Sequence, residues 1–332
     1  MVRSVEENLY PLIALAGPTA SGKTALALAL AEAFNGEIVS CDSVAVYRLM
    51  EIGTAKPSRE ERARVPHHCL DLYWPDEACT AGDWARQASA AIADIRSRGR
   101  LPIVAGGTGL YLRALLDGLA PAPPRDAALR ERLRSRADSR GGAYLHRMLE
   151  RLDAAAAGAI HANDVPKLVR SLEVTLAARA PQTEQWKVGR EGLIGYKVLR
   201  FGLAPERKAL YGHIDARAAA MFGRGIVEET AALRARFGDA CRPLSSLGYA
   251  QGMQVLRGEV PLVAAIAAAQ QGHRNYAKRQ MTWFRSEAEM RWLGGFGDEA
   301  VIQEEALGKV RSILSIAAAA EAAKQRQHLW HG

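Results

Sequence analysis

Gly17-Pro18-Thr19-Ala20-Ser21-Gly22-Lys23-Thr24 lies near the start of the chain, directly after the apolar run Leu12–Ala16. The octapeptide fits the pattern G-x-x-x-x-G-K-[ST] at every specified position. The apolar run predicts a buried parallel strand, and the residues from Lys23 to about Phe34 predict a helix that ends at Asn35-Gly36. A strand, a glycine-rich loop and a helix in this order predict a phosphate-binding loop.

The residues of this loop are suited to phosphate oxygens. Glycines let the backbone fold around an anion, and the N-terminus of the following helix adds a partial positive charge. The Lys23 ammonium neutralises phosphate oxygens, and the Thr24 hydroxyl is suited to a Mg²⁺ ion. The motif therefore predicts binding of a di- or triphosphate, but it does not by itself establish ATP hydrolysis or kinase activity.

Further apolar runs extend the pattern of strands and helices. They predict buried strands at Glu37–Cys41, Leu101–Ala105 and Val198–Leu203, and the segment Gly82–Arg98 predicts a helix. Strands that alternate with helices are typical of parallel sheets. We therefore predict an α/β fold with a P-loop NTPase-like parallel sheet core.

A helical insertion interrupts this core. Ala120–Pro124 is a stiff, proline-rich hinge, and the residues from Arg125 to about Ala180 show helical spacing without any strand pattern. Pro181 marks the second boundary. We predict a catalytic core of residues 1–120 and 182–332, with residues 121–181 as an inserted all-helical domain.

Asp42 ends the second predicted strand, at the edge of the sheet where ligands bind in such folds. Its carboxylate could hold Mg²⁺ through water, or it could face the acceptor substrate and take its proton. A structural interpretation is that Asp42 and Ser43 cap the following turn. The residues alone leave these three alternatives open.

Gly106-Gly107-Thr108-Gly109 follows the strand Leu101–Ala105. Glycines at this point allow close approach of a ligand to the backbone and would direct Thr108 into the same cleft. A plain turn from strand to helix explains the pattern about as well.

Two other groups of residues invite a functional interpretation. His67 and His68 are adjacent, and no further cluster has metal-ligand spacing, so we expect one to pack and one to be a polar surface residue. Arg274, Lys278 and Arg285 share one helical face, which is typical of contact with a phosphate backbone. The alternative is a solvated basic face whose aromatic neighbours pack in the core.

Composition limits the function classes. The 332 residues suggest two domains, and 48% hydrophobic with 24% charged residues exclude a largely disordered chain. The formal net charge of +8 hints at a polyanionic partner. No apolar run is long enough to cross a membrane, no secretory signal is present, and the four cysteines form no C-x-x-C pair. We therefore expect a cytoplasmic protein with free thiols and no membrane partner.

Several blocks together resemble the tRNA dimethylallyltransferases, and they occur in that family's order over most of the chain. In chain order they are Gly17–Thr24, Cys41–Tyr47, Ile52–Pro57, Pro66–Asp71, Gly106–Tyr111, Asn163-Asp164 with Arg170–Val174, Leu247–Tyr249 and Ala277–Trp283. The blocks I-G-T-A-K-P and A-K-R-Q-M-T-W are far more specific than the phosphate loop alone.

The resemblance implies transfer of a dimethylallyl group from dimethylallyl diphosphate to the exocyclic amine of the adenosine 3′ of the anticodon. It implies Mg²⁺, a tRNA anticodon stem-loop as partner with a flipped-out base, and an insertion domain that contacts tRNA; we expect a monomer. The implied catalytic residues are Asp42 as the base, Thr108, Lys23 and Arg217. The implied donor-binding residues are Gly17, Thr19, Ala20, Ser21, Gly22, Lys23 and Thr24, with Thr24 also at the metal. The implied tRNA-binding residues are Asp42, Ser43, Val44, Ala45, Arg130, Lys167, Arg170, Gly248 and Tyr249.

The chain departs from the family pattern at a few positions. Ala45 stands where glutamine is common, Lys167 where arginine is more usual, and Ser245 and Ala250 where basic residues are common. No cysteine follows Cys241, so the C-terminal zinc finger of eukaryotic members is not expected. Competing functions are an adenylate isopentenyltransferase, an ATP-driven P-loop kinase or NTPase, and a non-catalytic RNA-binding module.

Overall fold

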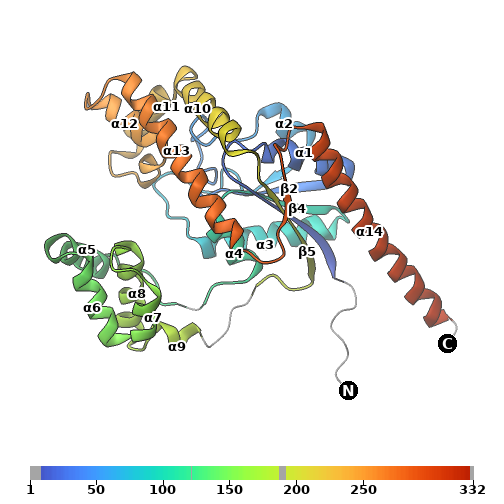
Figure 1. The fold of residues 1–332 in the computed structure, drawn as a ribbon, viewed down its shortest axis with the longest axis horizontal. Coiled ribbons are helices and arrows are strands. Elements are labelled where there is room, and N and C mark those ends of the chain that lie inside the picture. Colours follow the sequence, from blue (N-terminus) through green and yellow to red (C-terminus); the bar gives the residue numbers. More distant parts are fainter. Residues whose placement is uncertain (1–8, 121, 187–191, 330–332) are drawn as a thin grey trace. The chain divides into compact units, whose positions relative to one another are not determined.

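The computed structural model describes the backbone of residues 9–120, 122–186 and 192–329, and their side chains except at 185–186 and 316–329 (Figure 1). These residues form two compact units. The first comprises the described residues up to Leu115 and from Ile194 onward, and the second comprises Leu116–Leu193.

A six-stranded sheet in the order β3-β2-β4-β1-β5-β6 forms the centre of the first unit. All its neighbouring strands are parallel, which confirms the predicted α/β core. The strands are β1 (Tyr10–Ala16), β2 (Gly36–Cys41), β3 (His67–His68), β4 (Leu101–Gly106), β5 (Tyr196–Leu203) and β6 (Arg291–Leu293). Our sequence analysis identified the four inner strands and missed the short edge strands β3 and β6.

Helices cover both faces of this sheet. On one face, α1 (Lys23–Ala33) and α14 (Ala300–Leu329) pack against apolar side chains of the strands (Figure 1). On the other face lies α3 (Ala81–Ser97), which begins at a capping box formed by Thr80 and Asp83. Its buried Trp84 donates a hydrogen bond from Nε1 to the Ser40 carbonyl at 3.0 Å, so α3 is fixed to β2.

The register of the strands brings three loops to one edge of the sheet. Ala16 of β1 pairs with Gly106 of β4, and Cys41 of β2 pairs with the same Gly106. The loops that follow β1, β2 and β4 therefore leave the sheet at the same point along its strands. This places the phosphate loop, Asp42 and the loop after β4 beside one another.

The remaining helices of the first unit follow in sequence. They are α2 (Arg59–Arg64), α4 (Gly109–Leu116, whose last residue belongs to the second unit), α10 (Arg207–Gly223), α11 (Ile226–Phe237), the 3₁₀ helix η1 (Arg242–Ser245), α12 (Tyr249–Leu256) and α13 (Leu262–Arg285). Among them, α13 packs against α10 and α12. This helix carries the A-K-R-Q-M-T-W block, so its packing fixes one wall of the site described below.

The second unit is helical throughout its described residues. Its helices are α5 (Ala127–Arg140), α6 (Gly142–Leu152), α7 (Ala154–Ala159), α8 (Val165–Ala178) and α9 (Gln182–Trp186). Leu133, Leu145, Leu149, Leu168 and Leu172 form its apolar core. The unit therefore has a core of its own, as a domain needs.

Candidate active site

The phosphate loop connects β1 to α1 and contains two left-handed residues, Ala20 with φ 62° and Gly22 with φ 81°. Ser21 is fully buried, and its hydroxyl donates to the Pro18 carbonyl at 2.8 Å, which closes the turn. In the part of the chain that the structure describes, the backbone N–H groups of residues 20–24 donate to no protein acceptor. They remain free to bind an anion at the N-terminus of α1.

Two cations face this loop. Burial, and then the neighbouring Arg217 guanidinium, lower the pKa of Lys23 from 10.5 to about 7. Burial also lowers the pKa of Arg217, whose Nε has no hydrogen-bond partner. Among the described residues, neither cation has a carboxylate within ion-pair distance, so this part of the site carries positive charge that a bound anion would balance.

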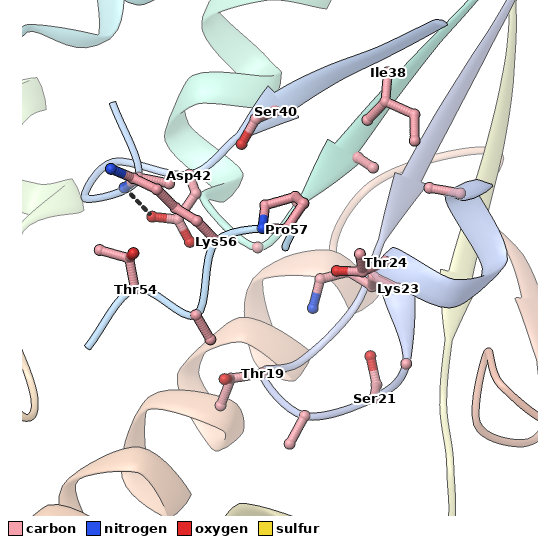
Figure 2. A pocket seen from close by; sticks show the side chains of 18 of the residues that line it. Thr19, Ser21, Lys23, Thr24, Ile38, Ser40, Asp42, Thr54, Lys56 and Pro57 are labelled. Carbon is pink, nitrogen blue, oxygen red and sulfur yellow. Dashed lines mark hydrogen bonds between the residues drawn. The ribbon is translucent and has the colours of Figure 1, made fainter. Parts of the chain in front are cut away.

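Asp42 lies at the carboxyl end of β2, opposite the loop (Figure 2). One carboxylate oxygen, Oδ1, accepts hydrogen bonds from the backbone N–H groups of Val44 at 2.8 Å and Ala45 at 3.1 Å. The capping interpretation is therefore confirmed for Asp42, whereas no capping bond of the Ser43 side chain is observed among the described residues. The Asp42 cap uses one oxygen only, so it does not exclude a second role for Oδ2.

Thr108 lies directly behind Asp42 and does not itself line the cavity. Its hydroxyl accepts a hydrogen bond from the backbone N–H of Ser43 at 3.1 Å, and its own N–H donates to the Cys41 carbonyl at 3.2 Å. Thr108 thus ties the loop after β4 to the residues on both sides of Asp42. Tyr276 of α13 also interacts with the Thr108 hydroxyl; burial and then Asp42 raise the pKa of Tyr276 to about 12.

These groups surround one cavity of about 220 Å³ (Figure 2). Its walls come from the phosphate loop and the start of α1, from β2, β3 and β4 with the loops that follow β2 and β4, from the I-G-T-A-K-P loop, and from α10 and α13. The residues with side chains suited to chemistry there are Thr19, Ser21, Lys23, Thr24, Ser40, Asp42, Thr54, Lys56, His67, Arg217, Tyr276 and Gln280. The cavity therefore joins a phosphate site to a carboxylate.

Lys56 holds the I-G-T-A-K-P loop in place. Its side chain is only 1% exposed, and Nζ donates to Asp71 at 2.6 Å, to the Tyr47 carbonyl at 2.7 Å and to Glu51 at 2.9 Å. Such a buried cation with three acceptors fixes the backbone around it. The wall formed by Thr54–Pro57 is consequently well defined.

Comparison with known proteins identifies the family. The model of the IPP transferase family matches residues 45–287. A tRNA dimethylallyltransferase of Koribacter versatilis is 59% identical over 91% of this chain and 98% of its own length, and one of Solibacter usitatus is 53% identical over 92% and 99%. The chain belongs to the IPP transferase family.

Solved structures of the IPP transferase family show the same fold. The tRNA isopentenylpyrophosphate transferase of Bacillus halodurans is 35% identical, with a TM-score of 0.69 over 94% of this chain and 99% of that one. A eukaryotic dimethylallyltransferase, solved acting on tRNA, is 25% identical, with a TM-score of 0.75 over 92% and 78%. The resemblance drawn from the motifs, the transferase class and the P-loop core are thereby confirmed.

Tyr249 is one of the tRNA contacts that the family resemblance implies, and the structure places its side chain in the core beside the I-G-T-A-K-P loop. Its side chain is fully buried, and its hydroxyl donates to Glu229 at 2.6 Å and accepts from the Gly53 N–H at 3.2 Å. In this structure Tyr249 supports the I-G-T-A-K-P loop, while Gly248, with φ 89°, begins α12.

The other predicted tRNA contacts belong to two regions. Ser43, Val44 and the buried Ala45 follow Asp42 in the first unit. Lys167, Arg130 and Arg170 lie in the second unit, where Lys167 is exposed and pairs with Asp164. Both arginines pair at 2.8 Å with Glu173, which is fully buried, so they already have a structural partner.

His67 and His68 lie on the edge strand β3. His68 contacts the buried Glu37 through Nε2 at 2.6 Å, whereas the Nε2 of His67 has no partner at the cavity. Within the described residues, no three His, Cys, Asp or Glu side chains form a metal cluster.

The basic segment of α13 is divided between two roles. Arg274 pairs with Asp215 at 2.5 Å and Phe284 is buried, whereas Lys278 and Arg285 are exposed. Lys278 and Arg279 line an open groove along the outer face of α13. No helix in the described part of the chain is long and apolar enough to cross a membrane.

Several residues that line the cavity were not predicted as site residues, among them Lys56, Tyr276 and Gln280. All three stand in or beside blocks that carried the resemblance, which was the only signal available. The partners of Gln280 are distant in the sequence, so no local pattern could have shown what it contacts.

Proposed function

We propose that this protein transfers the dimethylallyl group of dimethylallyl diphosphate to the exocyclic amine of the adenosine 3′ of the anticodon in tRNA, releasing diphosphate. The observation that carries the proposal is the single cavity in which Lys23, Arg217 and the loop N–H groups lie opposite Asp42. The names of the relatives support the same reaction.

The chemistry accounts for both halves of the cavity. An adenine amine is a weak nucleophile because its lone pair is delocalised into the ring. The allylic C–O bond therefore breaks as the new C–N bond forms, and negative charge builds up on the departing diphosphate. Fixed cations and N–H groups at that position stabilise the transition state more than the ground state. Lys23, Arg217 and the loop are suited to this task.

The proton of the alkylated amine needs an acceptor, and Asp42 is our candidate. Its Oδ1 is held by two backbone N–H groups, which leaves Oδ2 to accept a proton without loss of the turn. Thr108 holds the next residue, Ser43, and so fixes the direction of the carboxylate. We propose that Thr108, which the resemblance places among the catalytic residues, acts by positioning Asp42.

The residues present fit a Mg²⁺ ion bound together with the diphosphate. The Thr24 side chain is exposed at the start of α1, and a hydroxyl there supplies one oxygen ligand in P-loop proteins. Mg²⁺ characteristically keeps several waters and substrate oxygens as its other ligands. When bound, it would neutralise charge on the leaving diphosphate.

We assign the tRNA contacts to exposed cations of both units. Lys278 and Arg279 on α13 and Lys167 in the second unit are exposed and suited to RNA phosphates. The target base would be extruded into the cavity and recognised there. We propose that residues 121–181 form the tRNA-contacting insertion and that a single chain in the cytoplasm is sufficient for activity.

The test offers the protein dimethylallyl diphosphate with either an anticodon stem-loop RNA or AMP, and in a separate reaction ATP alone. We expect prenylated adenosine only in the RNA, with one diphosphate released per transfer. Prenylation of AMP alone would establish the adenylate isopentenyltransferase instead. Release of the γ-phosphate of ATP without prenyl transfer would establish a kinase or NTPase.

A further inference from the structure

The buried side of α13 reaches two loops of the active site through one side chain, Gln280. Its amide oxygen accepts a hydrogen bond from the Thr19 N–H at 2.8 Å, and its amide nitrogen donates to the Gly107 carbonyl at 2.9 Å. The orientation of the amide follows from chemistry, because an N–H needs an acceptor and a carbonyl needs a donor. Gln280 is 6% exposed, so both bonds are shielded from water.

Two glycines of the loop after β4 leave room for side chains of α13. A Cβ on Gly107 would lie 2.1 Å from the Gln280 amide nitrogen, and a Cβ on Gly109 would lie 2.3 Å from the Trp283 indole. Gln280 and Trp283 are three residues apart on α13 and therefore share one side of it. The helix thus meets the loop on both sides of Thr108.

The bond to Thr19 also decides which N–H groups of the phosphate loop face a ligand. Because Gln280 accepts from the Thr19 N–H, that group is not available to an anion. The N–H groups of residues 20–24 donate to no described protein acceptor and form the anion site. Gln280 therefore fixes the point at which the loop turns toward the diphosphate.

We propose that Gln280 is a positioning residue for prenyl transfer, which holds the diphosphate loop and the Gly107–Thr108 loop at a fixed spacing from α13. The proposal rests on the proposed function. The first loop carries the leaving group and the second holds Ser43 next to Asp42, so their spacing sets the distance between donor and base. Errors of about 1 Å in such a spacing cost roughly 100-fold in rate.

The principal test replaces the two hydrogen-bonding groups without a large change in volume. In Gln280→Leu we expect kcat to fall by about 10- to 100-fold and the Kd for inorganic diphosphate to rise by about 10-fold. We expect the Kd for the anticodon stem-loop to stay within about twofold, because the exposed face of α13 is unchanged. Gln87→Leu, at an exposed glutamine of α3, is the matched control and should leave all three values unchanged.

A double-mutant cycle separates positioning from general loss of structure. Gly107→Ala should displace Gln280 and produce a similar loss, because its methyl group overlaps the amide nitrogen. In a Gln280→Ala background the same methyl group has room, so Gly107→Ala should then cost little more. Multiplicative losses in the double variant would overturn the proposal.

Other outcomes are equally decisive. Wild-type kcat and diphosphate affinity in Gln280→Leu would overturn the proposal. If that variant does not fold, Gln280→Met decides by the same two measurements and with the same expected losses, since it is uncharged, similar in volume and lacks the amide donor and acceptor. Diphosphate binding is measured without RNA, so the two proposals can fail separately. A wild-type protein that prenylates no RNA, beside Gln280 variants that lose diphosphate affinity, would overturn the proposed function alone.

Discussion

Lys23 and Arg217 approach one cavity from two helices, α1 and α10, and neither has a carboxylate partner within ion-pair distance among the described residues. Asp42 lines the same cavity, and its Oδ1 is bound by the backbone of its own turn. Two unbalanced cations at a buried site cost stability. They are consistent with a site selected to bind a polyanion rather than to hold the fold together.

The first prediction concerns that cost. The folded-state pKa of Lys23, about 7, lies below its ordinary value of 10.5, so the native state disfavours the charged form. The free-energy cost of keeping Lys23 charged in the native state is therefore complete below pH 7 and disappears as the pH rises toward 10.5. We therefore expect Lys23→Met to raise the free energy of unfolding by about 1–2 kcal/mol at pH 6, and by less at pH 9.

Urea denaturation at the two pH values measures this difference. Lys309→Met, at a partly exposed lysine of α14 that pairs with Glu305, is the control and should change stability by less than about 0.5 kcal/mol at either pH. An Lys23→Met protein that is less stable than the wild type at pH 6 would contradict the prediction.

The second prediction concerns proton uptake when diphosphate binds. Above pH 7 a growing fraction of Lys23 is neutral, and an anion binds the charged form more tightly. Binding at pH 8 should therefore take up a proton, and affinity should fall as the pH rises above 7. Calorimetry of inorganic diphosphate binding in buffers of different ionisation enthalpy measures the uptake.

Lys23→Met is the control in this second experiment, because any proton taken up by diphosphate itself remains in that variant. The difference between the two proteins should be a fraction of one proton at pH 8 and close to none at pH 5. An equal uptake in both proteins would show that Lys23 is already charged in the free enzyme.

The predictability of the fold differed between the sheet centre and its edges. Short segments rich in apolar residues identified β1, β2, β4 and β5, because strands covered on both faces need mostly apolar side chains. The edge strands β3 and β6 have only two and three residues. A two-residue strand made of His67 and His68 has neither length nor apolar character, so no sequence pattern could have predicted it.

The candidate site shows the same division. Lys23, Thr24 and Asp42 follow directly from local pattern, since a motif or a strand end places each of them. Gln280 lies 261 positions from Thr19 and 173 from Gly107, and Lys56 is 15 positions from Asp71. Contacts of this kind depend on how distant segments of the chain pack together. The residues next to Gln280 or Lys56 in the sequence do not determine that packing.

The third prediction concerns Asp42. Asp42→Asn keeps an oxygen for the N–H groups of Val44 and Ala45, so the turn should survive, but the amide cannot take the proton of the amine. We expect kcat to fall by about 10²- to 10⁴-fold with unchanged RNA affinity. Single-turnover prenylation and filter binding with the same stem-loop measure the two quantities.

Asp42→Ala provides the comparison for this variant. It loses the base and the turn, so we expect the same fall in kcat together with a loss of about 1 kcal/mol in stability. A kcat for Asp42→Asn within about threefold of the wild type would remove Asp42 from the role of base.

The fourth prediction concerns the metal. Thr24→Val removes the hydroxyl and keeps the shape of the side chain, so the fold should not change. We expect the Mg²⁺ concentration for half-maximal transfer to rise by about tenfold, because one oxygen ligand is lost. Thr24→Ser retains that oxygen and should behave like the wild type. Equal Mg²⁺ dependence in all three proteins would exclude Thr24 as a ligand.

The fifth prediction concerns the second unit, where Glu173 binds both Arg130 and Arg170. Burial raises the pKa of Glu173, but hydrogen bonds from the two arginines outweigh this and leave the pKa below its usual value. The stability that this pair of contacts provides is therefore present above about pH 4.5 and lost as the pH falls. We expect Glu173→Gln to destabilise the second unit by about 3 kcal/mol at pH 7, because two half-buried arginines lose their anion.

Hydrogen exchange of α5 and α8, the helices that carry these residues, localises the effect. Glu150→Gln, at an exposed glutamate of α6, should leave that exchange unchanged.

The same two proteins also test the tRNA contact proposed for this unit. If Arg130 and Arg170 bind RNA from the positions in which Glu173 holds them, Glu173→Gln should weaken stem-loop binding. This is expected although the substitution removes a negative charge, which by itself would favour RNA binding. If only exposed lysines such as Lys167 bind RNA, Glu173→Gln should lower the RNA affinity only by the fraction of the second unit that it unfolds. The two arginines would then have a structural role alone.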